Sequence, residues 1–419
     1  MSKFIIEGGI PLNGEIKVAG NKNAALPIIA AAALTDEDCI IENMPAIRDV
    51  DVMLEILADL GKKVERTAPN VCKVSGSISK TRVNDALANK LRASILYLSV
   101  ILAKTGEVEM VPPGGCVIGR RNVDSHFDVI ESFGATLEFD EKNYKANLSS
   151  PRAPYIFLKE ASVTATENAM LLAASVAGET TIDNAASEPH VSDLADVLKK
   201  MGAGISGRGT NRLIISGKDK LSGFRHRIMP DHIEAGTLAI AAASTKGEMI
   251  IHDAYREDLR MTYHYMKQMN VDLEFIDHKT LKVRPSEPVS QAKKIQVGLW
   301  PGFPTDLMSP MIVLATQAKG TTLCHDWMFE GRMFFVDKLI IMGAQIVQCD
   351  PHRVLVSGPT MLRGQELSSP DIRAGIALVI AALTARGTSR IDRIELVDRG
   401  YEDIAARLNK LGASITREQ

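Results

Sequence analysis

The segment from Val111 to Arg121 contains the side chain best suited to proton transfer or covalent chemistry. It reads Val-Pro-Pro-Gly-Gly-Cys-Val-Ile-Gly-Arg-Arg, and its thiol, Cys116, has Arg120, Arg121 and His126 near it in the sequence. Positive neighbours lower the pKa of a thiol and increase its thiolate fraction. The prolines and glycines predict a mobile loop rather than a core element. Cys116 therefore fits poorly the usual interpretation of a lone cysteine as a small buried hydrophobe.

A second set of chemically capable residues opens six apolar, alanine-rich segments, which we expect to be helices buried on nearly all sides. The segments are 23–34, 91–103, 167–177, 233–244, 307–318 and 372–385. Three cations lie at these openings, namely Lys22, Arg92 and Arg373. A cation near a helix N-terminus opposes the helix dipole unless an anion lies between them. If the helices of a domain run parallel, their N-terminal amides and these cations predict an anion-binding site.

The other polar residues near the openings have a second interpretation. Thr166, Asp231 and Asp306 are residue types that cap helices, and capping explains them as well as a site does. Arg332 and Arg399 lie in loops before amphipathic helices, where a surface ion pair is the default for a lone arginine. The sequence contains no Walker A motif, HExxH or nucleophile elbow. It also contains no carboxylate cluster with metal-ligand spacing, so we expect neither cofactor nor metal.

These segments belong to a sixfold repeat of about 70 residues. In every repeat an apolar residue followed by Gly or Asn ends an amphipathic helix, with the Gly or Asn at positions 61, 134, 202, 270, 343 and 412. Gly or Asn suits the left-handed residue that ends a helix. A second phrase, Gly followed by Glu or Thr, precedes a β-rich stretch at 106, 178, 247, 320 and 387. The pattern predicts a buried helix, a strand, an amphipathic helix and further strands in each repeat, with the six repeats in two groups of three.

The composition indicates a globular chain of two or three domains. Its 419 residues are 45% apolar and 24% charged with a net charge of -2, which argues against a nucleic-acid-binding protein. No apolar run approaches the roughly 20 residues of a membrane span, and the start lacks a stretch of signal-peptide length. Five scattered cysteines without CxxC spacing fit a reducing cytosol. We therefore expect a cytoplasmic protein that binds neither nucleic acid nor membrane.

Short motifs distributed over nearly the whole chain occur in a fixed order. They are Gly20-Asn21-Lys22-Asn23-Ala24, Leu91-Arg92-Ala93-Ser94, the Cys116 loop, Ser162-Val163, Pro230-Asp231, Pro301-Gly302-Phe303-Pro304-Thr305-Asp306, Phe329-Glu330, Asp371-Ile372-Arg373-Ala374-Gly375 and Asp398-Arg399-Gly400-Tyr401-Glu402. In this order they resemble the enolpyruvyl transferase family, in particular its members that act on UDP-N-acetylglucosamine. The related 5-enolpyruvylshikimate-3-phosphate synthases share the repeats but lack the Gly-Gly-Cys loop and the Asn-Lys-Asn opening.

The resemblance implies a two-domain, barrel-like, inside-out α/β fold of the enolpyruvyl transferase type. Six βαβαββ repeats, three per domain, place sheets outside and helices inside. In this family the chain crosses between the domains twice, so the first residues join the C-terminal half. The implied domains are 22–229, which carries the mobile Cys116 loop, and 1–21 plus 230–419.

The resemblance also implies a reaction. The enolpyruvyl group of phosphoenolpyruvate moves to the 3′-hydroxyl of UDP-N-acetylglucosamine and phosphate leaves, which is the first committed step of peptidoglycan synthesis. Addition and then elimination pass through a tetrahedral ketal, so C3 of phosphoenolpyruvate gains a proton while the sugar hydroxyl loses one. The phosphate and carboxylate charges need neutralisation, and the arginines of the motifs can supply it without a metal.

Each motif residue has a role in the family that carries over to its position here. Cys116 is expected to be the general acid, able to form an adduct with phosphoenolpyruvate, and Asp306 the base, with Lys22 and Arg399 as further catalytic residues. The residues expected to bind phosphoenolpyruvate are Lys22, Asn23, Arg121, Arg332, Arg373 and Arg399. Those expected to bind the nucleotide sugar are Arg92, Arg121, Asn122, Val123, Asp124, Ser125, Ser162, Val163, Asp306 and Met328. The cleft is expected to be supported by His126, Asp231 and Asp371.

Four positions near the sugar-binding residues depart from the family pattern. Arg120 replaces a small residue, Asn122 a proline, Ser125 a leucine and Thr164 a glycine. A β-branched Thr164 is costly if that position needs a positive φ. The departures leave two alternatives open: an enolpyruvyl transferase with another acceptor, or a non-catalytic paralogue that binds a UDP-sugar. The sequence does not determine the oligomeric state.

Overall fold

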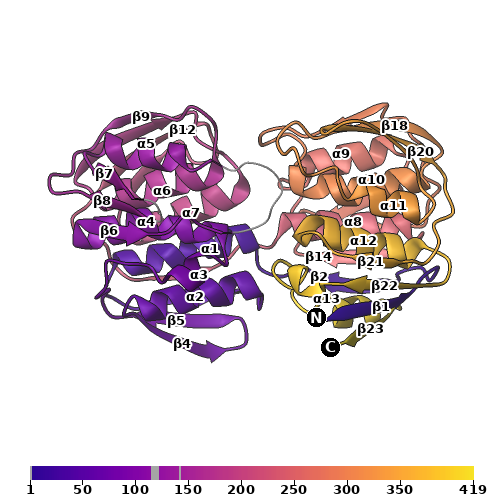
Figure 1. Cartoon of the computed structure of the whole chain (residues 1–419), viewed down its shortest axis with the longest axis horizontal. Coiled ribbons are helices and arrows are strands. Elements are labelled where there is room, and N and C mark those ends of the chain that lie inside the picture. Colours follow the sequence, from indigo (N-terminus) through magenta and orange to yellow (C-terminus); the bar gives the residue numbers. More distant parts are fainter. Residues whose placement is uncertain (1, 115–121, 141–142) are drawn as a thin grey trace. The chain divides into compact units, whose positions relative to one another are not determined.

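The computed structural model divides into two compact units (Figure 1). The described residues are 2–114, 122–140 and 143–419. The N-terminal unit comprises residues 20–114, 122–140 and 143–229, and the C-terminal unit comprises residues 2–19 and 230–419. Cys116, Arg120 and Arg121 lie outside the described residues, so the roles expected of them stay predictions.

Almost fully buried helices form the centre of each unit. In the N-terminal unit they are α1 (Lys22–Ala31), α4 (Leu96–Thr105) and α6 (Val163–Ala174), and in the C-terminal unit α8 (His232–Ser244), α10 (Met308–Gln317) and α12 (Ile372–Thr384). Short 3-10 turns adjoin three of them, namely η1 (Ala32–Leu34), η2 (Arg92–Ile95) and η3 (Thr305–Leu307). The helix α4 packs against α1 and α6, and α8, α10 and α12 pack against one another. The prediction of buried, alanine-rich helices is confirmed.

Two helix starts differ from the prediction. The helix α4 begins at Leu96 rather than at position 91, because η2 occupies Arg92–Ile95. The helix α6 begins at Val163 rather than at position 167, because the hydroxyl of Ser162 accepts a hydrogen bond from the amide of Ala165 and caps the helix. Thr166 is not a cap, since its hydroxyl donates to the carbonyl of Ser162 and accepts from the amide of Ala186. The N-terminal cap Ser162, rather than the apolar run alone, sets the start of this helix.

Amphipathic helices alternate with the buried ones. They are α2 (Arg48–Asp59), α5 (Asp124–Ser132), α7 (Pro189–Lys200), α9 (Arg260–Gln268), α11 (Val336–Ile341) and α13 (Ile404–Asn409), beside the short α3 (Asp85–Ala88) and η4 (Ile394–Leu396). The Gly or Asn after each amphipathic helix has a positive φ, from 57° at Asn270 to 114° at Gly61. The predicted left-handed residues at positions 61, 134, 202, 270, 343 and 412 are therefore confirmed.

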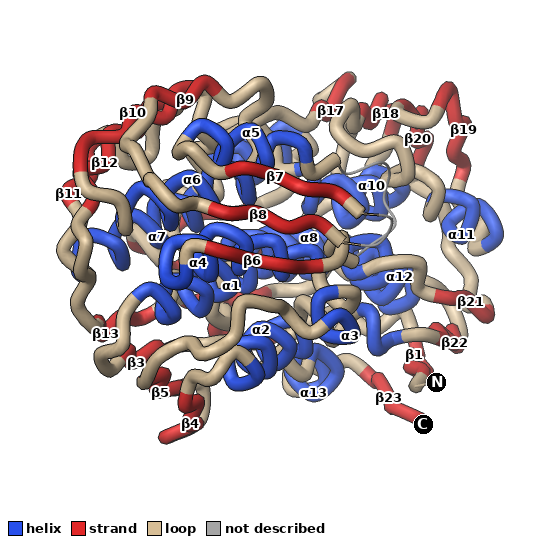
Figure 2. Tube along the Cα trace, turned by 60° about the vertical axis from the view of Figure 1, so that its left-hand side comes forward, coloured by secondary structure: helices blue, strands red, loops and turns tan. Residues whose placement is uncertain are grey.

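Small mixed sheets surround the helices of each unit, as the strands at the outside of both units show (Figure 1). In the N-terminal unit, one sheet has the strand order β13 (Phe224–Arg227), β3 (Cys39–Glu42), β5 (Val71–Ser75), β4 (Lys63–Ala68). A second sheet has the order β6 (Glu107–Met110), β8 (Tyr144–Asn147), β7 (Thr136–Phe139). A third has the order β11 (Gly204–Ser206), β12 (Arg212–Gly217), β10 (Gly178–Asp183), β9 (Tyr155–Phe157). Figure 2 shows β6, β8 and β7 side by side, with β6 packed on α4.

The C-terminal unit repeats this arrangement. Its sheets are β15 (Leu273–Asp277), β16 (Thr280–Val283), β14 (Met249–His252), β2 (Gly14–Lys17); β17 (Lys294–Gln296), β18 (Gly320–His325), β20 (Arg353–Gly358), β19 (Gln345–Asp350); and β21 (Glu366–Ser368), β22 (Thr388–Asp392), β1 (Lys3–Glu7), β23 (Ser414–Glu418). The strand β1 pairs antiparallel with β22 and β23, and β2 pairs parallel with β14. The first strands of the chain thus complete two sheets of the C-terminal unit.

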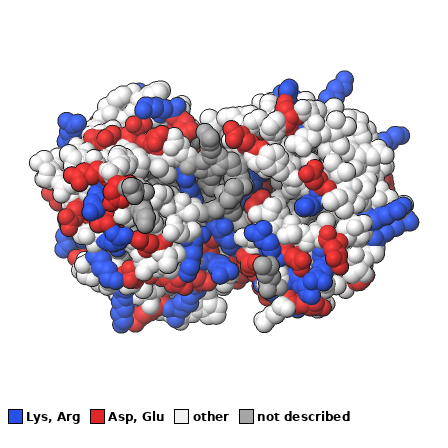
Figure 3. Space-filling view, viewed as in Figure 1, with Lys and Arg blue, Asp and Glu red and all other residues white. Residues whose placement is uncertain are grey.

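Each unit has its own hydrophobic core. On the face of the N-terminal unit that Figure 3 shows, basic and acidic side chains are intermingled. Across the described ranges, no helix combines the length and the apolar composition that crossing a bilayer requires.

Candidate active site

In the C-terminal unit, Asp306 lies between two buried arginines. It belongs to η3, directly before α10, while Arg332 precedes α11 and Arg373 is the second residue of α12. Arg332 Nη2 lies 3.2 Å from Asp306 Oδ1, and Arg373 Nη2 lies 2.8 Å from Asp306 Oδ2. The two arginine side chains are 2% and 7% exposed, but that of Asp306 is 25% exposed. The carboxylate is therefore the accessible member of a buried ionic cluster.

Asp326 and Phe329 hold Arg332 in place. Asp326 is fully buried and accepts hydrogen bonds from the amides of Met328 and Phe329 and from the hydroxyl of Thr305. Its Oδ2 lies 3.9 Å from Arg332 Nε, and the Arg332 guanidinium carbon lies 5.4 Å from the Phe329 ring centroid. Burial raises the pKa of Asp326, and the Thr305 hydroxyl and Arg332 oppose that rise. Sequence reasoning missed Asp326. For Arg332 it left two interpretations, a surface ion pair and a phosphoenolpyruvate-binding residue, and the 2% exposure of the side chain excludes the surface ion pair.

The starts of the buried helices in this unit converge on the cluster. Asp371 caps α12 by accepting hydrogen bonds from the amides of Arg373 and Ala374, and Asp231 caps α8 in the same way. His232, the first residue of α8, interacts electrostatically with Asp306 and Arg373. Burial lowers the pKa of His232 to about 4, with Asp306 opposing and Arg373 reinforcing the shift. His232 is thus neutral at pH 7 and adds no charge beside Asp306, a neighbour that sequence reasoning did not select.

In the N-terminal unit, Arg92 and His126 organise the starts of η2, α5 and α6. Arg92 Nη2 donates to the carbonyl of Asn122 at 2.6 Å. The Nδ2 of Asn168 lies 2.6 Å from His126 Nδ1, and Thr164 Oγ1 lies 3.2 Å from His126 Nε2. Because an amide nitrogen can only donate, the imidazole carries its proton on Nε2. Burial, reinforced by Arg92, lowers the pKa of His126 to about 3, so this ring is a neutral brace between helices.

Thr164 does not carry the strain that its β-branched side chain could have caused. It lies inside α6 and has no positive φ. Its hydroxyl contacts His126, a contact that a glycine could not make. At this position the departure from the family pattern is therefore compatible with the local backbone.

Lys22 forms a buried ion pair at the start of α1. Its Nζ lies 2.8 Å from Asp49 Oδ2, and the two side chains are 11% and 3% exposed. Asn21 caps the helix by accepting a hydrogen bond from the amide of Ala24 at 3.0 Å. Asp49 lies in the first turn of α2, and sequence reasoning did not select it.

The remaining predicted residues occupy the starts or flanks of helices. Asn23 follows Lys22 in α1, Asn122, Val123, Asp124 and Ser125 form the start of α5, Ser162 and Val163 begin α6, Met328 follows Asp326, and Arg399 lies between η4 and α13. Among the described contacts, the Ser125 hydroxyl lies 3.3 Å from Glu160 Oε1, and the Asn122 amide donates to Asp124. Every buried helix therefore has at least one residue of the predicted set in its first turn or in the segment directly before it.

Two glutamates near helix starts interact electrostatically. Glu167 lies in α6, and Glu188 directly precedes α7. Glu167 is buried and Glu188 half-buried, and one oxygen of each has no hydrogen-bond partner among the described residues. Burial, and then the charge of Glu188, raise the pKa of Glu167 well above its usual value. The unfolded chain releases this proton near pH 4.5, whereas the folded chain retains it. The stability from this group is complete below that pH and is lost as the pH rises through the folded pKa.

A glutamine at this position keeps the side chain neutral at every pH. Glu167→Gln is therefore expected to raise the melting temperature at pH 8 and to change it much less at pH 5. Thermal unfolding at both pH values checks this, with Glu179→Gln on the exposed face of β10 as the matched control. An equal shift at both pH values would contradict the prediction.

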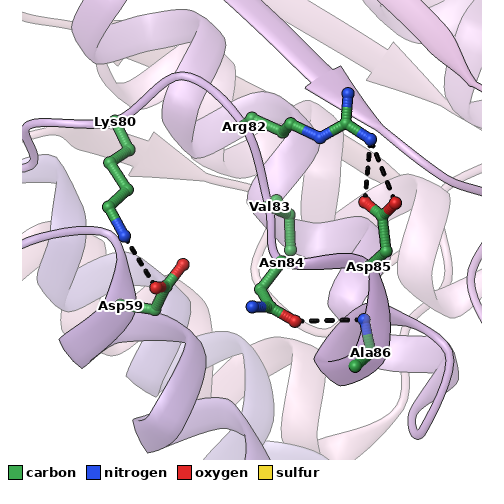
Figure 4. A pocket seen from close by; sticks show the side chains of 7 residues that line it. All are labelled: Asp59, Lys80, Arg82, Val83, Asn84, Asp85 and Ala86. Atoms are coloured by element: carbon green, nitrogen blue, oxygen red, sulfur yellow. Dashed lines mark hydrogen bonds and ion pairs between the residues drawn. The ribbon is translucent and has the colours of Figure 1, made fainter.

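A surface pocket of the N-terminal unit lies apart from these residues (Figure 4). It is lined by Asp59, Lys80, Arg82, Val83, Asn84, Asp85 and Ala86. Its charged groups pair with each other, Lys80 with Asp59 at 2.7 Å and Arg82 with Asp85 at 3.0 Å. None of the predicted site residues lines it. Within the described ranges, no three His, Cys, Asp or Glu side chains are arranged to hold a metal ion.

Comparison with known proteins gives one family along the whole chain. The family model described as EPSP synthase (3-phosphoshikimate 1-carboxyvinyltransferase) matches residues 6–408. The UDP-N-acetylglucosamine 1-carboxyvinyltransferase of Treponema denticola is 48% identical over 423 residues, covering 99% of both chains. The enzymes of the same name from Borreliella burgdorferi and Bacteroides thetaiotaomicron are 45% and 41% identical, and each covers the whole of this chain.

Solved structures show the same fold at lower identity. The enolpyruvyl transferase NikO from Streptomyces tendae matches with a TM-score of 0.87 at 23% identity, covering 99% of this chain and 98% of its own. EPSP synthase from Acinetobacter baumannii matches with a TM-score of 0.78 at 17% identity over the whole of both chains. The predicted enolpyruvyl transferase fold is confirmed. The chain belongs to the enolpyruvyl transferase family, among the UDP-N-acetylglucosamine 1-carboxyvinyltransferases.

Proposed function

We propose that the protein transfers the enolpyruvyl group of phosphoenolpyruvate to the 3′-hydroxyl of UDP-N-acetylglucosamine, releasing phosphate, at the committed step of peptidoglycan synthesis in the cytoplasm. The observation that carries the proposal is the partly exposed carboxylate of Asp306 between Arg332 and Arg373. It lies at the buried helix start where the resemblance places the base, in a chain 48% identical to one of these enzymes over 99% of its length.

Asp306 and the substrate compete for the two arginines. Each carboxylate oxygen of Asp306 contacts one guanidinium. Phosphoenolpyruvate brings a carboxylate and a phosphate, which accept charge-assisted hydrogen bonds from the same groups. When an arginine turns to the substrate, an oxygen of Asp306 can accept the proton of the sugar hydroxyl instead. The base then acts only once phosphoenolpyruvate is bound.

The two chemical steps use the remaining predicted residues. In the addition, the acid Cys116 protonates C3 of phosphoenolpyruvate, the sugar oxygen bonds to C2, and Asp306 takes the hydroxyl proton. In the elimination, the C2–O bond to phosphate breaks, C3 returns a proton to the Cys116 thiolate, and the double bond is restored. The departing phosphate takes the proton held by Asp306. Lys22, Arg121 and Arg399 stabilise the departing phosphate electrostatically.

Binding of the nucleotide sugar depends on residues at the starts of α5 and α6. Arg92 fixes the backbone at Asn122, and the neutral ring of His126 braces α5 against Thr164 and Asn168. Residues 122–125 and Ser162 are thus held on a rigid support, which favours one geometry for the sugar.

The test is phosphate release by the purified protein with both substrates. We expect release that requires UDP-N-acetylglucosamine and yields an enolpyruvyl product on the sugar, detected by mass spectrometry. No release above that of an Asp306→Asn preparation would contradict the proposal. Faster product formation with a different acceptor in a panel of nucleotide sugars would keep the transfer but reassign its acceptor.

A further inference from the structure

Behind the cluster of Asp306, Tyr401 contacts the far side of Arg373. Tyr401 lies just before α13 and is 1% exposed. Arg373 Nη1 donates to the Tyr401 hydroxyl oxygen at 3.1 Å, whereas its Nη2 faces Asp306 at 2.8 Å. The guanidinium carbon also lies 5.6 Å from the Tyr401 ring centroid, within the range of a cation–π contact. Tyr401 therefore forms a hydrogen bond with Nη1, the terminal nitrogen of Arg373 that does not contact Asp306.

Thr237 determines which group donates in the hydrogen bond between Thr237 and Tyr401, and therefore how Tyr401 faces Arg373. Thr237 Oγ1 lies 3.1 Å from the Tyr401 oxygen, and its hydroxyl donates to the carbonyl of Ile233 at 2.7 Å. A threonine has a single hydroxyl proton, so its oxygen must accept from Tyr401. The Tyr401 proton consequently points at Thr237, and the tyrosine oxygen presents a lone pair to Arg373. The threonine thus fixes Tyr401 as an acceptor.

Of Arg373, Tyr401 and Thr237, only Arg373 carries a charge. Burial raises the pKa of Tyr401, although the positive charge of Arg373 opposes the rise, so the tyrosine stays neutral. Desolvation opposes the charge on Arg373, but Asp306, Tyr401 and Asp231 outweigh it and raise its pKa, so the guanidinium stays protonated. A buried guanidinium that loses one of its acceptors bears a desolvation cost, and this favours a fixed orientation.

We infer that Tyr401, oriented by Thr237, is a positioning residue for Arg373 in the binding of phosphoenolpyruvate. The inference rests on the proposed function and extends it. When the substrate carboxylate draws Arg373 Nη2 from Asp306, the contact of Nη1 with Tyr401 persists and the guanidinium plane keeps its direction. Tyr401 does not touch the reacting atoms, because its hydroxyl is committed to Arg373 and Thr237.

Tyr401→Phe removes the hydroxyl and retains the ring. We expect the KM for phosphoenolpyruvate to rise about tenfold, the loss typical of a hydrogen bond to a charged group, with a KM for UDP-N-acetylglucosamine within about twofold of wild type. Thr237→Val removes the acceptor of the tyrosine proton, so it should raise the same KM. Thr237→Ser keeps a hydroxyl at this position and should restore a KM near that of wild type.

Tyr97→Phe in α4 is the matched control. Tyr97 is also fully buried, and its hydroxyl donates to the carbonyl of Met53 at 2.7 Å in the other unit. It should lower the melting temperature about as much as Tyr401→Phe without changing the KM for phosphoenolpyruvate. If the wild-type protein is active and Tyr401→Phe has an unchanged KM for phosphoenolpyruvate, the inference is overturned and the proposed function stands. Absence of turnover by the wild-type protein would overturn the proposed function, and the inference with it.

Discussion

Replacing Asp306 by asparagine is expected to reduce the rate of phosphate release by a factor of about 10² to 10⁴, the usual contribution of a positioned base. The amide has the shape of the carboxylate but cannot take the proton of the sugar hydroxyl. The same change removes the negative charge that competes with phosphoenolpyruvate for Arg332 and Arg373. We therefore expect the KM for phosphoenolpyruvate to stay the same or fall while kcat drops. Steady-state kinetics with each substrate varied in turn measures both quantities.

The matched control for this change is Asp350→Asn. Asp350 also pairs with an arginine, Arg353 at 2.6 Å, but it ends the edge strand β19 and makes no hydrogen bond or ion pair with a site residue that the structure describes. It should leave kcat and both KM values near those of wild type. A loss of activity in Asp306→Asn that matches a rise in the KM for phosphoenolpyruvate, at constant kcat, would show that Asp306 assists binding rather than proton transfer.

The buried helices and the left-handed turns could be predicted because their signals are local. An alanine-rich run without a polar face has to be buried, whatever it packs against. A Gly or Asn after an amphipathic run has the conformational freedom that a helix end needs, as Gly61 and Asn270 show. The start of α6 was mispredicted because Ser162 and Thr166 are both good caps by residue type. Only the hydrogen bonds distinguish them.

The candidate site could be predicted only in part, for a different reason. Cations at helix starts are visible along the sequence, but the groups that form ion pairs or hydrogen bonds with them come from elsewhere in the chain. Asp49, Asp326 and Tyr401 lie in elements whose local sequences give no sign of a partner. Arg332 illustrates the consequence, since an isolated arginine is usually exposed and this one is buried only because two aspartates lie beside it. Buried charge depends on tertiary contacts, which single-sequence patterns do not encode.

The buried pair of Lys22 and Asp49 allows stability and catalysis to be separated. Lys22→Met removes the ammonium group that lies 2.8 Å from the carboxylate of Asp49, whose side chain is 3% exposed. Breaking a buried ion pair by removing one member costs about 3 to 5 kcal/mol. Lys22 is also expected to bind the phosphate of phosphoenolpyruvate. The single variant should therefore have both a lower free energy of unfolding and almost no activity.

The double variant Lys22→Met/Asp49→Asn distinguishes the two effects. Neutralising Asp49 removes the buried negative charge that Lys22 balanced, so most of the lost free energy of unfolding should return, as measured by denaturant titration. The positive charge for the phosphate stays absent, so phosphate release should remain as low as in the single variant. Recovery of activity together with stability would show that Lys22 serves only to neutralise Asp49. Recovery of stability alone would assign the charge of Lys22 to the substrate, because a group needed only for folding becomes dispensable once folding is restored.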